Sequence, residues 1–203
     1  MQLRNLVLLA CLMAPTAFGG DVPVGGRLPD LSIAERGELV LTGEDVGYRT
    51  WTYPQQPGKV HVLQYMAATR AASNINQAFT DRMKTDLPKG SFLSTTILNL
   101  DEALWGTGGL VASELKSNKK QFPGAVLVAD ENGTGLSQWQ LEKESSAIVI
   151  TDPAGVVRYF KQGAMSDTEI ESALEMVRQY IAAGAPPLAA AGATGTPLSP
   201  TAY

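Results

Sequence analysis

Hydrophobic and polar positions follow two periods along this chain, and together they predict an α/β protein. Apolar runs of strand length occur at residues 60–66, 93–100, 125–130 and 147–151. Between and after these runs, apolar residues recur every three or four positions, as they do on one face of a helix. Strands that alternate with helices are typical of a sheet that contains parallel strands.

The stretch Gly58–Phe79 contains both periods and organises the prediction. The strand Val60–Met66 ends in the small residues Ala67-Ala68-Thr69, and a helix follows directly. The residues predicted to form its buried face are Ala72, Ile75, Phe79 and Met83. A helix that starts at a strand end leaves backbone N–H groups without intrahelical partners at that edge of the sheet, where α/β proteins usually place their sites.

The N-terminal third predicts a β-hairpin. Apolar and polar residues alternate along residues 28–33, as they do in an edge strand. Glu35–Glu38 is predicted to be the turn and residues 39–41 the returning strand. Residues 48–53 predict a further short strand.

Two helices are predicted in the second half of the chain. Residues 103–110 read as a glycine-rich flexible loop, and the first helix follows at Val111–Phe122, with Val111, Leu115 and Phe122 facing inward. Its lysines 116, 119 and 120 indicate either a solvated face or a surface for an acidic partner.

The rest of the second half predicts a short element at 135–141 and a buried, central strand at Ala147–Thr151. The turn at 152–155 leads to an antiparallel strand at 156–160. Ser166–Glu169 has the capping-box pattern of a final helix that runs to about Ala182. The residues of its predicted buried stripe are Ile170, Leu174, Val177 and Ile181.

The first residues predict export from the cytoplasm. Arg4, the apolar run Leu6–Met13 and the small-x-small triplet Ala17-Phe18-Gly19 have the order of a secretory signal peptide, so residues 1–19 are expected to be cleaved. The alternative is a lipoprotein signal that ends at Cys11. Because Cys11 is the only cysteine of the chain, cleavage would leave a mature protein that can form no disulfide.

Composition limits the remaining possibilities. The charge is −4 and the few bases are scattered, which disfavours nucleic acid as a partner, and no apolar stretch is long enough to span a membrane. Residues 20–182 are expected to form one domain. Residues 183–203 contain Ala, Gly, Pro, Thr and Ser but no charge, which predicts a disordered tail, with a tether or docking peptide as the alternative.

The stretch from Gly58 resembles the first strand and helix of a periplasmic thioredoxin-like domain, in which a Gly-Lys-Val strand leads to a Cys-x-x-Cys motif. On that pattern the two cysteines are replaced by Arg70 and Ser73, and the family's cis-proline by Ser146, where a trans peptide bond is expected. The whole chain more closely resembles the YtfJ family of bacterial periplasmic proteins. The resemblance implies a thioredoxin-like three-layer α/β fold, with a mixed central sheet and an N-terminal β-hairpin, in a soluble, Sec-exported periplasmic protein.

The same resemblance implies that one edge of the sheet gathers the candidate binding residues. They are Thr69, Arg70, Ser73, Asp101, Glu102, Glu144, Ser145 and Ser146. One hypothesis is that Arg70, with the hydroxyls of Thr69 and Ser73, holds an anion or a carboxylate at the helix start. The alternative is that Thr69 or Ser73 caps the helix, while Arg70 is solvated or pairs with Glu144.

These patterns favour a binding or interaction module over thiol-disulfide or peroxidase chemistry. The expected partner is an unknown periplasmic protein or a small anionic ligand, and no cofactor or metal motif is present. The alternative is a non-redox enzyme in which Arg70 anchors an anion and Asp101 or Glu144 acts as acid or base. His61, the only histidine, lies inside a strand, where a hydrogen-bonded sheet histidine is expected rather than a catalytic base.

Overall fold

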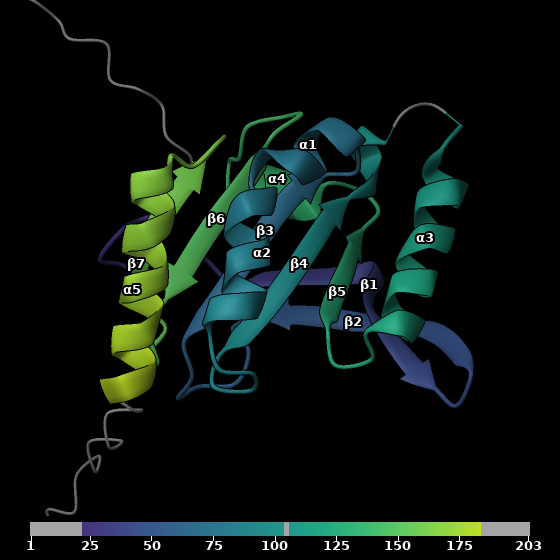
Figure 1. Cartoon of the computed structure of the whole chain (residues 1–203). Helices are drawn as coiled ribbons and strands as arrows, with labels where there is room; N and C mark the ends of the chain where they lie inside the picture. The colour runs from purple at the N-terminus through teal and green to yellow at the C-terminus, as the bar shows by residue number, and fades with distance from the viewer. Residues whose placement is uncertain (1–21, 104–105, 184–203) are drawn as a thin grey trace, which may run out of the picture.

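The computed structural model describes residues 22–103 and 106–183, and the chain folds there into one sheet with helices against it (Figure 1). The predicted signal peptide and all but the first residue of the predicted disordered tail lie outside the described residues. The strands are β1 (Leu31–Thr42), β2 (Asp45–Tyr53), β3 (His61–Ala67), β4 (Leu93–Asn99), β5 (Val126–Asp130), β6 (Ser146–Thr151) and β7 (Val157–Gln162). The helices are α1 (Arg70–Ile75), α2 (Gln77–Asp86), the 3-10 turn η1 (Leu100–Glu102), α3 (Gly108–Gln121), α4 (Thr134–Gln138) and α5 (Asp167–Ala183).

The seven described strands form one mixed sheet in the order β2-β1-β5-β4-β3-β6-β7. Strands β3, β4 and β5 are parallel, and every other neighbouring pair is antiparallel. Parallel strands require crossover connections, which here contain α1 and α2 after β3 and α3 after β4. The carboxyl ends of these three strands therefore lie at one edge of the sheet.

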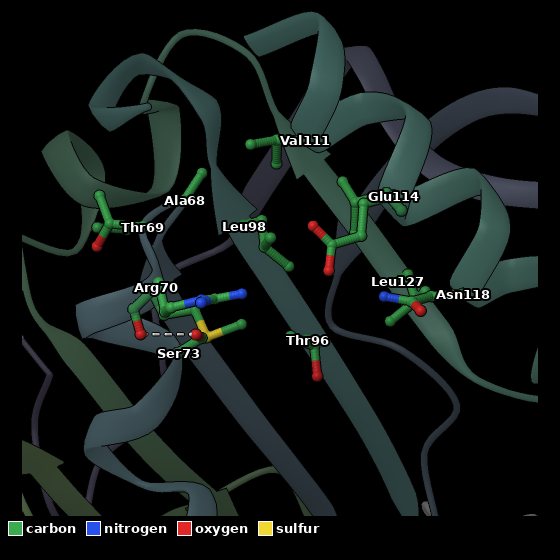
Figure 2. A pocket seen from close by; sticks show the side chains of 13 residues that line it. Ala68, Thr69, Arg70, Ser73, Thr96, Leu98, Val111, Glu114, Asn118 and Leu127 are labelled. Carbon is green, nitrogen blue, oxygen red and sulfur yellow. Dashed lines mark hydrogen bonds between the residues drawn. The ribbon is translucent and has the colours of Figure 1, made fainter. Parts of the chain in front are cut away.

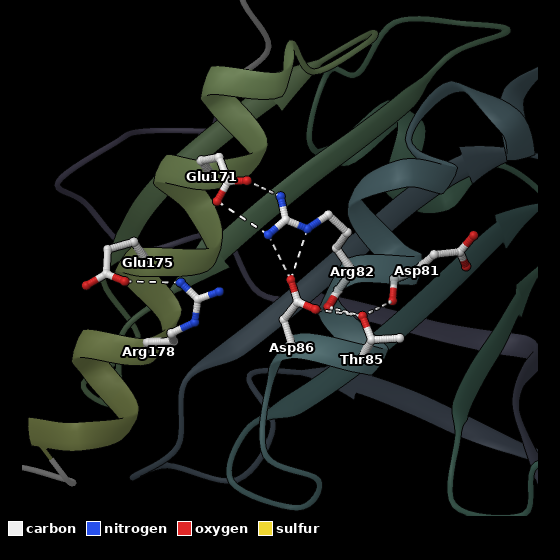
Figure 3. Close-up of polar contacts among 7 residues, drawn as sticks. All are labelled: Asp81, Arg82, Thr85, Asp86, Glu171, Glu175 and Arg178. Atoms are coloured by element: carbon white, nitrogen blue, oxygen red, sulfur yellow. Dashed lines mark hydrogen bonds and ion pairs between the residues drawn. The ribbon is translucent and has the colours of Figure 1, made fainter.

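One face of the sheet carries the longer helices, separated into two groups. Helices α2 and α5 share a buried cluster with β3 and β6, which contains Phe79, Met83, Ile148, Leu174 and Val177. Arg82 of α2 also forms ion pairs with Asp86 and with Glu171 of α5 (Figure 3). Helix α3 packs apart from this pair, through Leu115, in a smaller cluster with Leu39 and Ala129.

The opposite face buries the largest cluster, which joins the start of β1 to the short helix α4. Trp139, which follows α4, is fully buried and donates a hydrogen bond from Nε1 to the carbonyl of Pro29 at 3.0 Å. Its ring meets those of Tyr53 and Tyr65 edge-on, with centroids 6.2 and 6.4 Å apart. Elements on both faces give the molecule its three layers.

The predicted position of the N-terminal hairpin turn was wrong. The chain continues through Glu35–Glu38 as a bulge inside β1, and the hairpin turns at Gly43 and Glu44 before β2. Arg36 and Gly37 have φ values of +62° and +70°, and a Cβ on Gly37 would lie 2.3 Å from the carbonyl oxygen of Arg49. Residues 36–38 of the bulge pair with β5, so β1 lies inside the sheet and is no edge strand.

The helical predictions need four corrections. The helix after β3 breaks at Asn76, and the helix predicted from Val111 begins at Gly108, inside the expected loop. Phe122 is 57% exposed instead of inward-facing. Lys119, expected on a solvated face, is buried and donates from Nζ to the carbonyls of Pro123 and Ala125.

Most predictions for the last third are confirmed. β6 and β7 form the antiparallel pair, although β6 lies beside the edge strand and β4 occupies the centre. Ser166 and Glu169 exchange the hydrogen bonds of a capping box, and α5 ends at Ala183. In the described ranges only Tyr53–Pro54 is cis, so the Ser145–Ser146 peptide bond is trans, as expected.

Candidate functional site

The helix start at the edge of β3 uses its capping hydroxyl internally. Thr69 is extended, and its Oγ1 accepts a hydrogen bond from the backbone N–H of Ala72 at 3.2 Å. Ser73 donates from Oγ to the carbonyl of Arg70 at 2.9 Å, while its own N–H bonds to the carbonyl of Thr69. Two of the first amides are therefore satisfied within α1, and the helix start by itself makes no site.

A cavity of about 280 Å³ lies beside this turn, over the end of β4 and next to α3. Three of the predicted residues, Thr69, Arg70 and Ser73, line it. Figure 2 shows that Arg70 and Glu114 reach toward one another across β4, from α1 and from α3. The cavity thus places a guanidinium and a carboxylate on opposite walls.

Three polar side chains of this cavity are not consumed by the fold. Within residues 22–103 and 106–183, the side chains of Arg70, Glu114 and Asn118 have neither a hydrogen bond nor an ion pair. Arg70 is exposed and does not pair with Glu144, so the structure has the solvated arginine beside a Thr69 cap that the alternative describes. A guanidinium offers five donors in a planar fork, so this wall is equipped to bind a carboxylate or phosphate.

The expected acidic members of the site lie elsewhere. Neither Asp101 nor Glu144 lines the cavity. The backbone N–H of Glu144, a residue with φ +53°, donates to Oε1 of Glu102, and Oε2 of Glu102 accepts from Nδ2 of Asn99 at 2.8 Å. The N–H of Asp101 bonds to Oδ1 of Asn99. The carboxylate of Glu102 therefore fixes the loop before β6 and does not face Arg70.

The two predicted serines are also separated from the cavity. The carbonyl of Ser145 accepts from the N–H of Ala67 at 3.0 Å. Ser146 is 1% exposed, and its Oγ accepts from Gln64 at 3.3 Å and from Asn76 at 3.2 Å. Asn76 also donates to the carbonyl of Gly163 and accepts from the N–H of Met165. Ser146 is thus part of a buried hydrogen-bonded network that holds β6 to the break between α1 and α2.

A second buried polar network lies at the end of β5. Asp130 is fully buried, and its carboxylate accepts hydrogen bonds from the Tyr65 hydroxyl at 2.9 Å and from the N–H groups of Thr134 and Gly135. Burial, and then the neighbouring Asp130, raise the pKa of Tyr65 well above its usual range. Tyr65 therefore stays protonated and serves as a donor that positions α4.

His61 behaves as the sequence predicts. It is 4% exposed in β3, one of its ring nitrogens, Nε2, lies 2.8 Å from Oγ1 of Thr95, and burial lowers its pKa to about 4. Across the described part of the chain, no group of three or more His, Cys, Asp or Glu side chains is placed to hold a metal ion. Nor is any helix there long and apolar enough to cross a membrane.

Sequence reasoning missed Glu114 and Asn118, which complete the cavity wall. Their spacing of four residues places them on one face of α3, but only the fold shows that this face turns toward Arg70. Asn76 and Asn99 were also missed. The sequence offered one signal for each: Asn76 is a polar residue where the helical pattern breaks, and Asn99 is a polar residue at the end of a strand.

Comparison with solved structures identifies the class of fold. The chain is similar to a putative protein disulfide isomerase from Bacteroides thetaiotaomicron, with a TM-score of 0.57 and 16% identity over 82% of this chain and 95% of that one. It is also similar to a putative thiol:disulfide interchange protein DsbE from Chlorobium tepidum, with a TM-score of 0.54 and 13% identity over 79% of this chain and 99% of that one. At such identities the likeness shows the fold alone: this is a thioredoxin-like domain.

Comparison of sequences identifies the family. Residues 22–180 match the family model YtfJ_HI0045, described as a bacterial protein of unknown function. The chain is 38% identical to the uncharacterized protein YtfJ of Escherichia coli K12, over 89% of this chain and 100% of that protein. It is 29% identical to an uncharacterized protein of Haemophilus influenzae, over 86% of this chain and 96% of that protein. The chain therefore belongs to the YtfJ_HI0045 family.

Proposed function

We propose that this protein is an exported binding module that uses the thioredoxin-like scaffold without thiol chemistry. Its ligand carries an anionic group, and this group binds Arg70 in the cavity between α1 and α3. The observation that carries the proposal is a guanidinium that lines a cavity without any partner in the described residues. The leader-like residues 1–19 support export to the periplasm.

Glu114 narrows the class of ligand. A carboxylate on the opposite wall repels a simple anion and attracts a cation or a hydrogen-bond donor. Thr96 of β4 and Asn118 of α3 add uncharged polar groups to the lining of the same cavity. A small zwitterion, such as an amino acid or the end of a short peptide, satisfies both walls, and a cavity of about 280 Å³ limits the bound part to a small group.

The enzyme alternative has weaker support. It requires Asp101 or Glu144 as acid or base beside Arg70, and neither residue lines the cavity. Binding without covalent chemistry is the function that these residues support best.

A thermal-shift screen of the full-length protein tests the proposal, with amino acids, short peptides and inorganic anions as probes. A ligand at about 100 times its Kd stabilises by about 2.7 kcal/mol, which raises the Tm of a domain of this size by roughly 5–10 °C. We expect a zwitterion to shift the wild type but not Arg70→Ala, and to shift Glu114→Gln less.

The matched control is Lys59→Ala, which removes an exposed cation outside the cavity. It should leave the shift unchanged. A shift that survives in Arg70→Ala, or no shift with any probe, would refute the assigned site. A simple anion that binds Glu114→Gln more tightly than wild type would confirm the charge arrangement but exclude the zwitterion.

A further inference from the structure

A groove of about 860 Å³ continues from the Arg70 cavity along β4, between α2 and α3. Figure 1 shows β4 between these two helices, with no element in front of it. Ser94 and Thr96 on the groove floor are half-buried, and the walls include Phe79 and Met83 of α2. Phe122, at the end of α3, lines the opposite wall and is 57% exposed. The volume lies within the roughly 300–1,000 Å³ typical of ligand pockets.

The groove has a largely uncharged lining. Of its charged lining residues, Asp81 and Lys84 are exposed and pair with one another at 3.3 Å, and Lys89 is exposed in the loop before β4. The remaining lining residues are apolar or neutral. Because an unpaired charge is costly to bury, the lining suits an uncharged occupant.

The chain itself contains a segment of that chemistry. Residues 184–203 include no charged side chain, and the two leucines of this stretch, Leu188 and Leu198, each follow a proline. Proline-rich segments favour the extended polyproline II conformation and lose little entropy when they bind an apolar groove.

This segment follows α5, which ends on the other side of α2 from the groove. Arg82 of α2 contacts Glu171, near the start of α5, and Arg178 lies near Asp86 at the end of α2 (Figure 3). The two helices therefore run in the same direction, and α5 ends beside Leu87, which lines the groove. Only α2, a cylinder roughly 10–12 Å across, lies between them, whereas 20 extended residues span up to ~66 Å.

We propose that residues 184–203 bind in the α2–α3 groove of their own chain, with Leu188 or Leu198 against the exposed ring of Phe122. Attachment to α5 gives the segment an effective concentration in the millimolar range, so weak contacts suffice for partial occupancy. The groove shares Met66, Ser73 and Thr96 with the Arg70 cavity. The groove and segment argue for this contact whether or not the cavity binds an anion.

Alkylation of a single cysteine tests the proposal. Ser94→Cys is made in the full chain with Cys11→Ser, and the rate of its reaction with iodoacetamide is compared with that of the same protein ending at Ala183. We expect the full chain to react at least threefold more slowly. Ser172→Cys, on the exposed side of α5, is the matched control and should react equally in both chains.

Three further measurements identify the occupant. A synthetic peptide of residues 184–203 should slow the reaction in the shortened chain, and Leu188→Asp with Leu198→Asp should restore the fast rate in the full chain. Protection that increases with protein concentration would assign the groove to a second copy and overturn the same-chain contact, as would equal rates in the two chains. Protection should persist in Arg70→Ala, so failure of the anion site and failure of this contact are distinguishable.

Discussion

Two groups of polar side chains lie near the same edge of the sheet and differ in how completely the protein satisfies them. Around Asp130 and Asn76, the buried side chains bond to strands, helix starts and each other. Arg70 and Glu114 line a cavity, and their side chains have no partner in the described residues. A buried polar group without a partner costs stability, so satisfied groups serve the fold, whereas exposed and unpaired ones remain available for a ligand.

The largest effect is expected at the satisfied carboxylate of Asp130. Asp130→Ala removes the acceptor of the Tyr65 hydroxyl and of two backbone N–H groups, and it leaves these buried donors unpaired. We expect the free energy of unfolding to fall by about 3 kcal/mol or more, measured by urea denaturation. Tyr65→Phe removes one of the three donors and should cost about 1–2 kcal/mol. A loss below 1 kcal/mol in Asp130→Ala would show that the network does not support the fold.

The buried His61 makes the stability of the folded protein sensitive to acid. Its pKa is about 4 in the folded protein and about 6.5 when unfolded, so between these values the unfolded chain binds a proton that the folded chain does not. Stability is therefore fully present above pH 6.5 and falls as the pH drops toward 4, by about 3 kcal/mol in total. The difference between wild type and His61→Gln, followed by urea denaturation at each pH, isolates this contribution from that of the carboxylates. Parallel pH profiles for the two proteins would contradict it.

A substitution at Asn76 tests the hydrogen-bonded network at the break between α1 and α2. Asn76→Ala leaves the N–H of Met165 and the carbonyl of Gly163 without their partner, and we expect a loss of about 1–3 kcal/mol in the free energy of unfolding. Asn74→Ala, two residues earlier and exposed, is the matched control and should change stability by less than about 0.5 kcal/mol. Equal effects of the two substitutions would mean that the buried contacts of Asn76 contribute little.

The sequence predicts the order of elements because apolar periodicity reports burial, and β3, β4 and β6 are recognisable from their apolar runs. Within the candidate site, the strand-to-helix turn places Thr69, Arg70 and Ser73 on one cavity. What the sequence does not predict depends on contacts between distant segments. The bulge at Gly37 follows from pairing with β5, the separation of Glu144 from Arg70 follows from its bond to Glu102, and the role of Glu114 depends on the position of α3.

The smallest effect on the free energy of unfolding is expected at Arg70. This substitution tests most directly whether the cavity side chains differ from the hydrogen-bonded ones. Because its guanidinium has no partner in the described residues, Arg70→Ala removes no interaction that supports the fold, and the free energy of unfolding without ligand should change by less than about 0.5 kcal/mol. Glu114→Ala should behave in the same way, measured by urea denaturation beside Asp130→Ala. If Arg70→Ala destabilised the protein by more than 1 kcal/mol, Arg70 would belong with the satisfied groups, and a loss of ligand binding in that variant could not be assigned to a lost contact. A neutral effect on stability, together with a lost ligand shift, leaves recognition as the reason for an arginine at this position.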